Sequence, residues 1–254
     1  MKLKIFQLNI QNGRMLREII EYCRIQDFDI VHFQEVSGGE LSKDKSDNFS
    51  VFKDALSMEG ILAVGTHKAK DPSSYYGNAT FYKSSLDLVS DEVIWLKPFS
   101  RFDRWEVGGD FSRNLPRNAI ALQFKLKEKY FWSINTHLAW GPTPHDEPYK
   151  VNQVKVLEDF IKKIREPFVL TGDFNITKNS EIIRRFDKLA INHSLQTGLK
   201  NTLNPNLHRV KELFPLGLAV DFIYTSFGME ANSFDLVNNP DLSDHYGLRI
   251  VIDL

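Results

Sequence analysis

Short apolar runs that end in polar residues recur along this chain, and they constrain its fold more than any other feature. Residues 168–170 form one such run, and a run of this length predicts a buried β-strand. Asp173 and Asn175 follow it on either side of Phe174, so both face away from the core into which Phe174 points. Gly172 leaves room for a ligand or a neighbouring backbone to approach closely. Such a strand end suits a cation or a phosphate, although an ordinary Asp/Asn turn has the same sequence pattern.

The same pattern extends from one end of the sequence to the other. Polar residues stand at or beside the ends of several further predicted strands: Asn9, Glu35, His137, Asp221, Asp244 and His245. In α/β sheets, functional sites gather beyond the carboxyl ends of strands. A site assembled from residues this far apart predicts that residues 1–254 fold as a single domain.

Hydrophobic periodicity and turn residues predict the elements between these sites. Strands are expected at residues 3–10, 28–36, 61–66, 78–82, 89–96, 118–125, 130–138, 168–170, 220–225 and 246–254. Helices are expected at residues 15–26, 48–58, 149–165 and 180–189. Residues 75–77 are predicted to lie in a loop, and 97–117 in a long irregular stretch. Hairpin-like strand pairs mixed with helices predict a mixed α/β sheet architecture, not a purely parallel one.

Composition limits the partners and the compartment of the protein. The formal net charge is −1 at pH 7, so a strongly basic footprint for nucleic acid is absent overall, while a local basic face remains compatible. Cys23 is the only cysteine, which excludes an intrachain disulfide, and we expect it to be a small buried hydrophobe. No segment reads as a signal peptide or a bilayer span, so we expect a cytoplasmic protein without membrane insertion. We predict no obligate protein partner.

The chemistry of the polar set narrows the kind of site. Carboxylates, amides and two histidines dominate, and oxygen ligands suit a hard cation, Mg²⁺ or Mn²⁺, better than Zn²⁺. Ser243, Asp244 and His245 cannot form a Ser–His–Asp relay, because adjacent side chains diverge along the chain. The sequence has no Gly-rich phosphate loop with a lysine, which argues against ATP hydrolysis by that route.

Several short motifs occur in order along nearly the whole chain: Leu8-Asn9-Ile10, Phe33-Gln34-Glu35-Val36, Gly77-Asn78-Ala79, Asn135-Thr136-His137-Leu138, Gly172-Asp173-Phe174-Asn175, Asp221-Phe222-Ile223-Tyr224 and Ser243-Asp244-His245. Each motif is weak alone, but the ordered set resembles the endonuclease/exonuclease/phosphatase superfamily. The resemblance implies a four-layer α/β sandwich, in which two mixed β-sheets lie face to face under outer helices. It also implies divalent-metal-dependent cleavage of phosphate esters.

The resemblance implies a metal site at the first two strand ends. Glu35 resembles the principal metal ligand, helped by Asn9 and Asp244. The abasic-site endonucleases of this superfamily usually carry an aspartate two residues after the first asparagine, where this chain has Gln11. That difference weakens the case for a second metal and for a strict abasic-site enzyme.

The resemblance also implies roles for five residues in the reaction. Asp173 resembles the group that orients or deprotonates the attacking water, and Asn175 resembles a donor to a phosphate oxygen. Asp221 resembles the partner that orients His245, which contacts the scissile phosphate. His137 resembles the histidine that stabilises or protonates the leaving oxygen. Together they describe an in-line displacement with donors gathered on the developing charge.

Substrate contacts are predicted from weaker signals. Asn78, from the third motif, is a candidate, or simply a polar residue at the start of a strand. Arg101, Arg104 and Trp105 interleave charge with an aromatic ring and are candidates for binding a phosphate backbone and stacking a base. The alternative is a solvated loop, because acidic residues in the same stretch offset the arginines. His32 lies on a predicted buried strand and is expected in the core.

Three functions remain open at this point. The first is a nuclease or DNA-end phosphodiesterase; residues 137–153 and the ending 243–248 look somewhat like the 5′-tyrosyl-DNA phosphodiesterase branch. The second is a phosphodiesterase or phosphatase of small-molecule or lipid phosphates, which predicts a closed pocket or an apolar lip. The third is a catalytically silent binding module, but the retained carboxylates and histidines argue against it.

Overall fold

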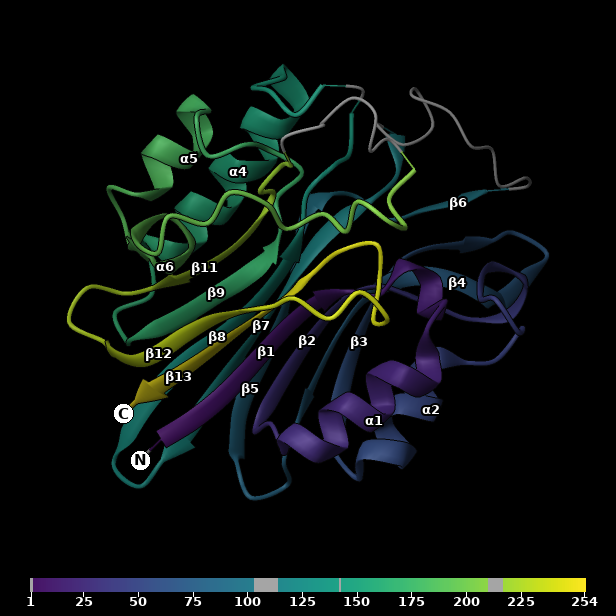
Figure 1. The fold of residues 1–254 in the computed structure, drawn as a ribbon, viewed down its shortest axis with the longest axis horizontal. Coiled ribbons are helices and arrows are strands. Elements are labelled where there is room, and N and C mark those ends of the chain that lie inside the picture. Colours follow the sequence, from purple (N-terminus) through teal and green to yellow (C-terminus); the bar gives the residue numbers. More distant parts are fainter. Residues whose placement is uncertain (1, 103–113, 142, 210–216) are drawn as a thin grey trace.

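A computed structural model describes residues 2–102, 114–141, 143–209 and 217–254 (Figure 1). The chain forms two mixed β-sheets. The first has seven strands in the order β12 (Glu230–Val237), β13 (Gly247–Asp253), β1 (Lys2–Asn9), β2 (Ile30–Ser37), β4 (Asp71–Tyr82), β3 (Glu59–Lys68) and β6 (Ser100–Phe102). The second has six, in the order β10 (Ile191–Asn192), β11 (Asp221–Thr225), β9 (Phe168–Asp173), β8 (Lys129–His137), β7 (Arg117–Leu126) and β5 (Asp87–Lys97).

Helices cover the outer face of each sheet, which gives the predicted four layers (Figure 1). α1 (Leu16–Gln26) and α2 (Asn48–Leu56) pack on the first sheet through a cluster that contains Ile19, Cys23 and Phe52. α4 (Pro148–Ile161) and α5 (Glu181–Phe186) pack on the second sheet, and the short α6 (His193–Gln196) follows them. Short 3-10 turns, η1 (Gln11–Gly13) and η2 (Gly39–Leu41), follow β1 and β2. Among the described residues, no helix combines the length and the apolar character needed to span a bilayer.

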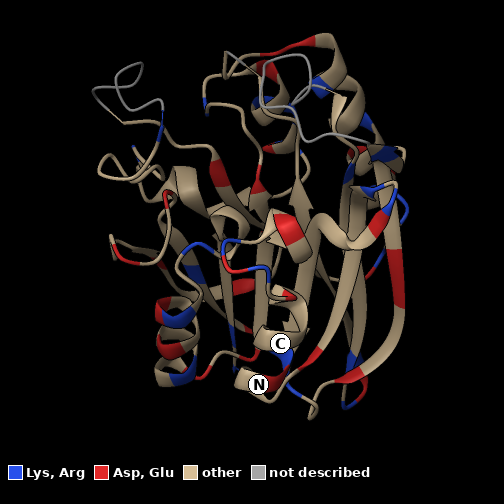
Figure 2. Ribbon diagram, turned by 90° about the vertical axis from the view of Figure 1, so that its right-hand side faces the viewer, with Lys and Arg blue, Asp and Glu red and all other residues tan. Residues whose placement is uncertain are grey.

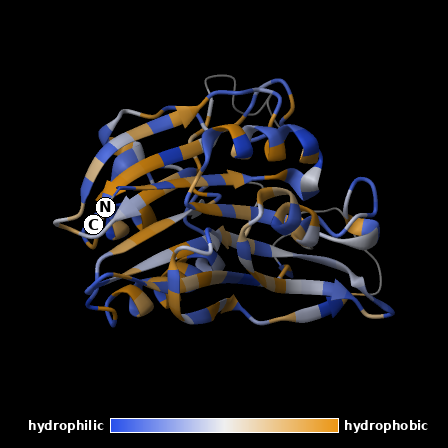
Figure 3. Cartoon of the chain, turned by 90° about the horizontal axis from the view of Figure 1, so that it is seen from below, coloured by the Kyte–Doolittle hydropathy of each residue, from blue (hydrophilic) through white to orange (hydrophobic). Residues whose placement is uncertain are grey.

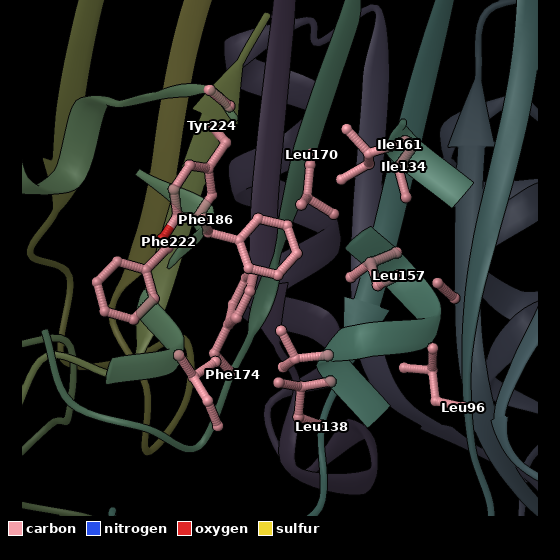
Figure 4. Close-up of a cluster of buried hydrophobic side chains, with 14 of the residues drawn as sticks. Leu96, Ile134, Leu138, Leu157, Ile161, Leu170, Phe174, Phe186, Phe222 and Tyr224 are labelled. Atoms are coloured by element: carbon pink, nitrogen blue, oxygen red, sulfur yellow. The ribbon is translucent and has the colours of Figure 1, made fainter. Parts of the chain in front are cut away.

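Three apolar clusters hold these layers together. One lies under α1 and α2, one lies between the sheets, and one lies under α4 and α5. The third includes Phe174, whose ring lies edge-on to Phe186 and Phe222, each about 90° from it (Figure 4). In Figure 3, hydrophobic and hydrophilic bands alternate along the strands, as expected where one face of a strand is more polar than the other. The prediction that Phe174 anchors the end of β9 in the core is confirmed.

The predicted loop at residues 75–77 is wrong, because these residues lie inside β4. Tyr75 and Tyr76 are buried, and β4 pairs with β2 on one side and β3 on the other. A Cβ on Gly77 would lie 2.2 Å from the carbonyl oxygen of Ala63. The glycine therefore permits close strand contact and does not mark a turn.

Two further differences concern the rim of the fold. β12 was not predicted, because it is an edge strand in which only Val237 is buried, so its sequence lacks clear alternation. Most of the predicted irregular stretch at 97–117 lies outside the described residues, and Ser100–Phe102 within it forms β6. His32 and Cys23 are buried as predicted.

Candidate active site

The strand ends of both sheets meet at one edge of the sandwich. The antiparallel register of β9 and β11 places Asp221 opposite Asp173, and the parallel register of β8 and β9 places His137 beside Asp173. Asn9, at the end of β1 in the first sheet, donates from Nδ2 to Oδ2 of Asp173 over 3.0 Å. His245 lies just before β13 and reaches the same oxygen at 3.9 Å from its Nε2. Residues from both extremes of the sequence therefore share one site, as predicted.

Asp173 is the centre of this site. Only 1% of its surface is exposed, and Oδ1 accepts a hydrogen bond from the backbone N–H of Asn175 at 2.8 Å. Burial raises the pKa of Asp173 to about 7, with a further increase from the charge of Asp221. The charge of His245 and the donor from Asn9 oppose that increase. Asp173 therefore changes protonation state near neutral pH, which suits a general base.

A close glycine contact fixes the spacing around Asp173. A Cβ on Gly172 would lie 2.0 Å from the carbonyl oxygen of Thr136 on β8. Any side chain at this position would push β8 and β9 apart. The close approach expected at Gly172 is therefore that of a neighbouring backbone.

His245 forms a buried ion pair with Asp221. Its Nδ1 lies 2.9 Å from Oδ2 of Asp221, whose side chain is fully buried. Burial alone would lower the pKa of His245, but the charges of Asp221, Asp173 and Asp244 raise it well above the ordinary value of 6.5. His245 is consequently a cation at neutral pH, with Nδ1 held by Asp221 and Nε2 directed toward Asp173.

His137 has the opposite protonation state. Burial lowers its pKa well below 6.5, and the positive charges of Arg117 and His245 lower it further. Its Nε2 lies 3.1 Å from Nδ2 of Asn175 and 3.5 Å from Oδ2 of Asp173. Asn175 adopts a left-handed φ of 50° and also donates to the carbonyl of Leu138 at 3.0 Å. The site thus holds one charged and one neutral imidazole around a single carboxylate.

Glu35 and Asp244 bring two more carboxylates to this edge. Glu35 is half-buried at an irregularity in the pairing of β2 with β4, with a left-handed φ of 61° that is costly for a non-glycine residue. Tyr76 hydrogen-bonds to it. Burial raises the pKa of Asp244, and the nearby charge of Glu35 raises it further. Two partly buried carboxylates that repel each other are the kind of oxygen donor set that a hard divalent cation would neutralise.

The geometry also contains two groups whose ligand atoms all lie within 4.8 Å of one another: Asp173 with Asp221 and His245, and His208 with Asp244 and His245. Both include His245, whose raised pKa leaves it protonated and disfavours it as a nitrogen ligand. The carboxylate oxygens are therefore the better donors. Possible metal-ligand groups are therefore present at this edge of the sandwich.

The predicted substrate residues do not join this cluster as directly. Asn78 is buried, and its Nδ2 donates to the backbone and side-chain oxygens of Asn118 at 3.1 and 2.9 Å. Arg101 is exposed on β6, at the outer edge of the first sheet. Arg104 and Trp105 lie outside the described residues.

Sequence reasoning missed two residues of the site. The ring of His208 lies 5.8 Å from that of His245, although it comes from an irregular stretch without periodicity. Lys150 is fully buried, and its ammonium donates to the carbonyl of Asn175 at 2.9 Å and to that of Thr143 at 3.1 Å. The sequence places Lys150 in the first turn of a predicted helix, and nothing in it indicates that the ammonium would contact Asn175.

Arg117 also lies in this site, although sequence alone placed it at the end of an irregular stretch. It is the first residue of β7 and is buried. Its Nε donates to the carbonyl of Leu138 at 3.2 Å, and its guanidinium carbon lies 5.9 Å from the centre of the Tyr76 ring. Burial is the main cause of the low pKa of His137, and the positive charge of Arg117 lowers that pKa further.

Comparisons with known proteins agree with this architecture. The model of the Endonuclease/Exonuclease/phosphatase family matches residues 6–245. A search among curated proteins found no match. Among solved structures, the endonuclease/exonuclease/phosphatase from Bacteroides vulgatus is similar with a TM-score of 0.76 and 20% identity, covering 100% of this chain and 99% of that one.

Two other similar structures carry more specific names. The mannosyl-6-phosphatase Bt3783 of Bacteroides thetaiotaomicron has a TM-score of 0.72 and 18% identity, covering 99% of this chain and all of its own. TDP2 of D. rerio, complexed with a single-strand DNA product, has a TM-score of 0.74 and 15% identity, covering 100% of this chain and 99% of its own. Identities this low show a shared fold only. Since the family match extends over nearly the whole chain, from the first strand to the histidine of the last motif, this chain belongs to the Endonuclease/Exonuclease/phosphatase family of hydrolytic phosphoesterases.

Proposed function

We propose that this protein is a divalent-metal-dependent phosphodiesterase that cleaves nucleic acid or DNA ends through in-line attack by water. The observation that carries the proposal is the environment of Asp173, a buried carboxylate with a pKa of about 7 between a cationic and a neutral histidine. A carboxylate with this pKa is matched to proton transfer at neutral pH. A binding module without catalytic activity would not need a carboxylate with this pKa.

Asp173 orients the attacking water and takes its proton. The hydrogen bonds from Asn9 and from the backbone of Asn175 hold its two oxygens in fixed directions. Because a donor from another residue of the site already holds each oxygen, the carboxylate is pre-organised before substrate binds.

His245 and Asn175 bind the phosphate. His245 presents a cationic N–H at Nε2, because Asp221 holds Nδ1. The Asn175 amide is the second donor; its Nδ2 contacts the Leu138 carbonyl and Nε2 of His137 in the free protein, so it would exchange one of these contacts for a phosphate oxygen, and Lys150 fixes the carbonyl of that residue. Donors that are already aimed stabilise charge as it develops on the phosphate oxygens.

His137 serves the leaving oxygen. Its neutral imidazole lies beside Asn175 and 3.5 Å from Asp173, on the β8 side of the site. With its pKa held well below 6.5, it interacts with the leaving group by hydrogen bonding and does not compete with His245 for the phosphate charge.

Glu35, Asn9 and Asp244 would hold Mg²⁺ or Mn²⁺. When bound, the cation draws charge from a phosphate oxygen and so favours attack at phosphorus. Asn9 also orients Asp173. Its Nδ2 donates to Asp173, and its Oδ1 accepts from the N–H of Gln11 at 3.1 Å. The metal site and the base are therefore joined through one side chain.

A nucleic-acid substrate would also need contacts beyond the buried cluster around Asp173. We propose Arg101, Arg104 and Trp105 for the phosphate backbone and a base, and the Oδ1 of Asn78 for a donor on the substrate, since its Nδ2 is engaged with Asn118. The single-strand DNA product bound to the D. rerio structure is in line with such a substrate. Figure 2 shows acidic and basic segments interspersed, which favours short or single-stranded substrates over long duplexes.

One observation favours a second candidate, a phosphodiesterase or phosphatase of small-molecule phosphates. A cavity of about 440 Å³ lies between residues 145–146, 177–180 and 217–219, the last two of which flank Asn175 and Asp221 in sequence. Its wall includes the basic side chains of Lys178 and Lys200. Its size is within the range of small-ligand pockets. The mannosyl-6-phosphatase among the similar structures is in line with this alternative.

Hydrolysis of a substrate panel tests the proposal and separates the two candidates. The panel holds abasic duplex, single-stranded DNA and RNA, a 5′-phosphotyrosyl oligonucleotide, bis-p-nitrophenyl phosphate, a hexose 6-phosphate and sphingomyelin, each with Mg²⁺, Mn²⁺ or EDTA. Metal-dependent cleavage of a nucleic acid that is lost in Glu35→Ala and Asp173→Asn supports the first candidate. Cleavage of small phosphates alone supports the second. Activity that both variants retain would contradict the proposed site.

A further inference from the structure

Four buried side chains form a continuous hydrogen-bonded chain between the sheets, and it ends on Asp221. Asn135 on β8 donates from Nδ2 to the backbone carbonyls of Phe33 and Ala79, at 3.1 and 2.8 Å. Its Oδ1 accepts from Nε2 of Gln34 at 2.7 Å. The exposed fraction of each amide side chain in this chain is 0%. The chain therefore lies wholly inside the sandwich.

The remaining links lead to the carboxylate. Oε1 of Gln34 accepts from Nε2 of Gln7 at 2.8 Å, and the same Nε2 donates to Oδ1 of Asp221 at 3.0 Å. The chain thus passes from β8 to β2, then to β1 and finally to β11, so that it crosses between the two sheets. It will be called the amide chain, meaning Asn135, Gln34 and Gln7.

The direction of every link follows from its first one. Backbone carbonyls can only accept, so Asn135 must present its NH₂ group to them and its oxygen to Gln34. Gln34 must then donate to Asn135 and accept from Gln7. Gln7 in turn has a donor, and not an oxygen, in position for Asp221. A reversed Gln7 amide would place its oxygen against two acceptor oxygens, which is unfavourable.

We propose that Gln7 is a positioning residue, which the amide chain orients so that Asp221 holds His245 in its catalytic geometry. A carboxylate whose Oδ1 is fixed by a donor cannot rotate freely, so Oδ2 stays directed at Nδ1 of His245, 2.9 Å away. The charged His245 ring then keeps Nε2 toward Asp173. This inference rests on the proposed function of His245 and deepens it.

The unpaired oxygen of Gln7 also supports a functional role for this residue. Its Oε1 is buried and has no hydrogen-bond partner among the described residues. A buried polar atom without a partner lowers stability, and an apolar replacement would avoid that cost only by leaving the acceptor oxygens of Gln34 and Asp221 without this donor. Side chains that are unfavourable for folding collect where function requires them.

The test compares Gln7→Met and Gln7→Glu with a matched control, Ser133→Ala. Met keeps the shape of glutamine without its donor, and Glu keeps the shape but offers oxygens to Asp221. Ser133 is equally buried between the sheets, but its partner is His32, at 2.9 Å, and it has no contact with Asp221. We expect kcat to fall roughly 10- to 100-fold in both Gln7 variants, with KM changed by less than about twofold, as for other residues that orient a catalytic group. Ser133→Ala should keep kcat.

A second readout does not depend on activity. The Nδ1–H proton of His245 in the wild type should give a downfield NMR signal that is protected from exchange, because Asp221 accepts it in a buried site. In Gln7→Met this signal should broaden or disappear, while Ser133→Ala keeps it. Wild-type kcat and an unchanged signal in Gln7→Met would overturn the proposal. If the wild type hydrolyses no phosphate ester, the proposed function fails, and the NMR signal still decides whether Gln7 positions Asp221.

Discussion

The two ends of the space between the sheets are built from the same strands but from opposite kinds of side chain. Along the inner face of β1, Leu3 and Ile5 lie at one end, and Gln7 and Asn9 lie at the other. β11 shows the same division between the two ends: Ile223 lies in the apolar cluster, and Asp221 lies in the site. Each strand thus changes from apolar to polar along a single face.

A polar layer lies between these ends. His32 on β2 contacts the hydroxyl of Thr171 at 2.6 Å through Nδ1 and that of Ser133 at 2.9 Å through Nε2. Both ring nitrogens are therefore satisfied without any contact to Asp173 or Asp221. The comparison teaches that burial gives stability at the apolar end, while hydrogen bonds to Asp173 and Asp221 hold the site end in place.

Asp173→Asn should have the largest effect on activity, because it changes the central residue of the site end. We expect kcat to fall by roughly 10³-fold, because the base is lost while shape is kept. The pKa of Asp173 in the folded protein is about 7, above the ordinary value of 3.8, so the folded state loses stability as pH rises from 4 to 7.

Asp173→Asn should consequently unfold at a higher temperature than the wild type at pH 8, and at a similar temperature at pH 4. Thermal unfolding at the two pH values checks this, with Asp91→Asn, the same substitution at an exposed residue of β5, as the control. A variant that is less stable at pH 8 would show that the ionised carboxylate is favoured by its surroundings.

Substitution at the apolar end should lower the stability of the protein and leave its activity nearly unchanged. Ile5→Ala removes a fully buried side chain from the cluster between the sheets, and we expect the free energy of unfolding to fall by about 3 kcal/mol. The kcat of the folded fraction should stay near that of the wild type. Urea unfolding and active-site titration together measure both quantities, and a matched Val251→Ala, at a half-buried position, should cost less.

The middle layer should respond to acid. Burial lowers the pKa of His32 from 6.5 to about 3, so the unfolded state takes up a proton that the folded state does not. Stability should therefore fall as pH decreases below 6.5, by about 2 kcal/mol at pH 5. Urea unfolding of wild type and His32→Gln across this range checks it, because the glutamine variant should lose this part of the pH dependence. If the free energy of unfolding falls equally with pH in the two proteins, His32 is not neutral in the folded state.

The parts of the site that were predictable are those encoded in short segments. Asp173, Phe174 and Asn175 are neighbours on one strand end, so alternation alone separates core from site. Glu35 and His137 were predicted in the same way, as polar residues at strand ends. The whole sandwich followed from ordered motifs and not from periodicity, which by itself gave only a mixed α/β sheet.

The parts that were missed depend on contacts between distant segments. Lys150 reaches Asn175 only because α4 packs beside the end of β9, and His208 reaches His245 through a stretch without regular structure. The glutamine pair Gln7 and Gln34 looked like ordinary polar residues of strand ends. Nothing in one sequence reports that two amides from different strands meet inside a sandwich. The nature of the metal and the cytoplasmic location stay predictions.

The contact at Gly172 has a consequence for anyone who wishes to redesign this enzyme. The 2.0 Å that separates a hypothetical Cβ from the Thr136 carbonyl means that the distance between β8 and β9 is set by the missing side chain. His137 and Asp173 lie directly opposite each other one residue further on. A library that varies residue 172 would thus alter the distance between His137 and Asp173 in every member.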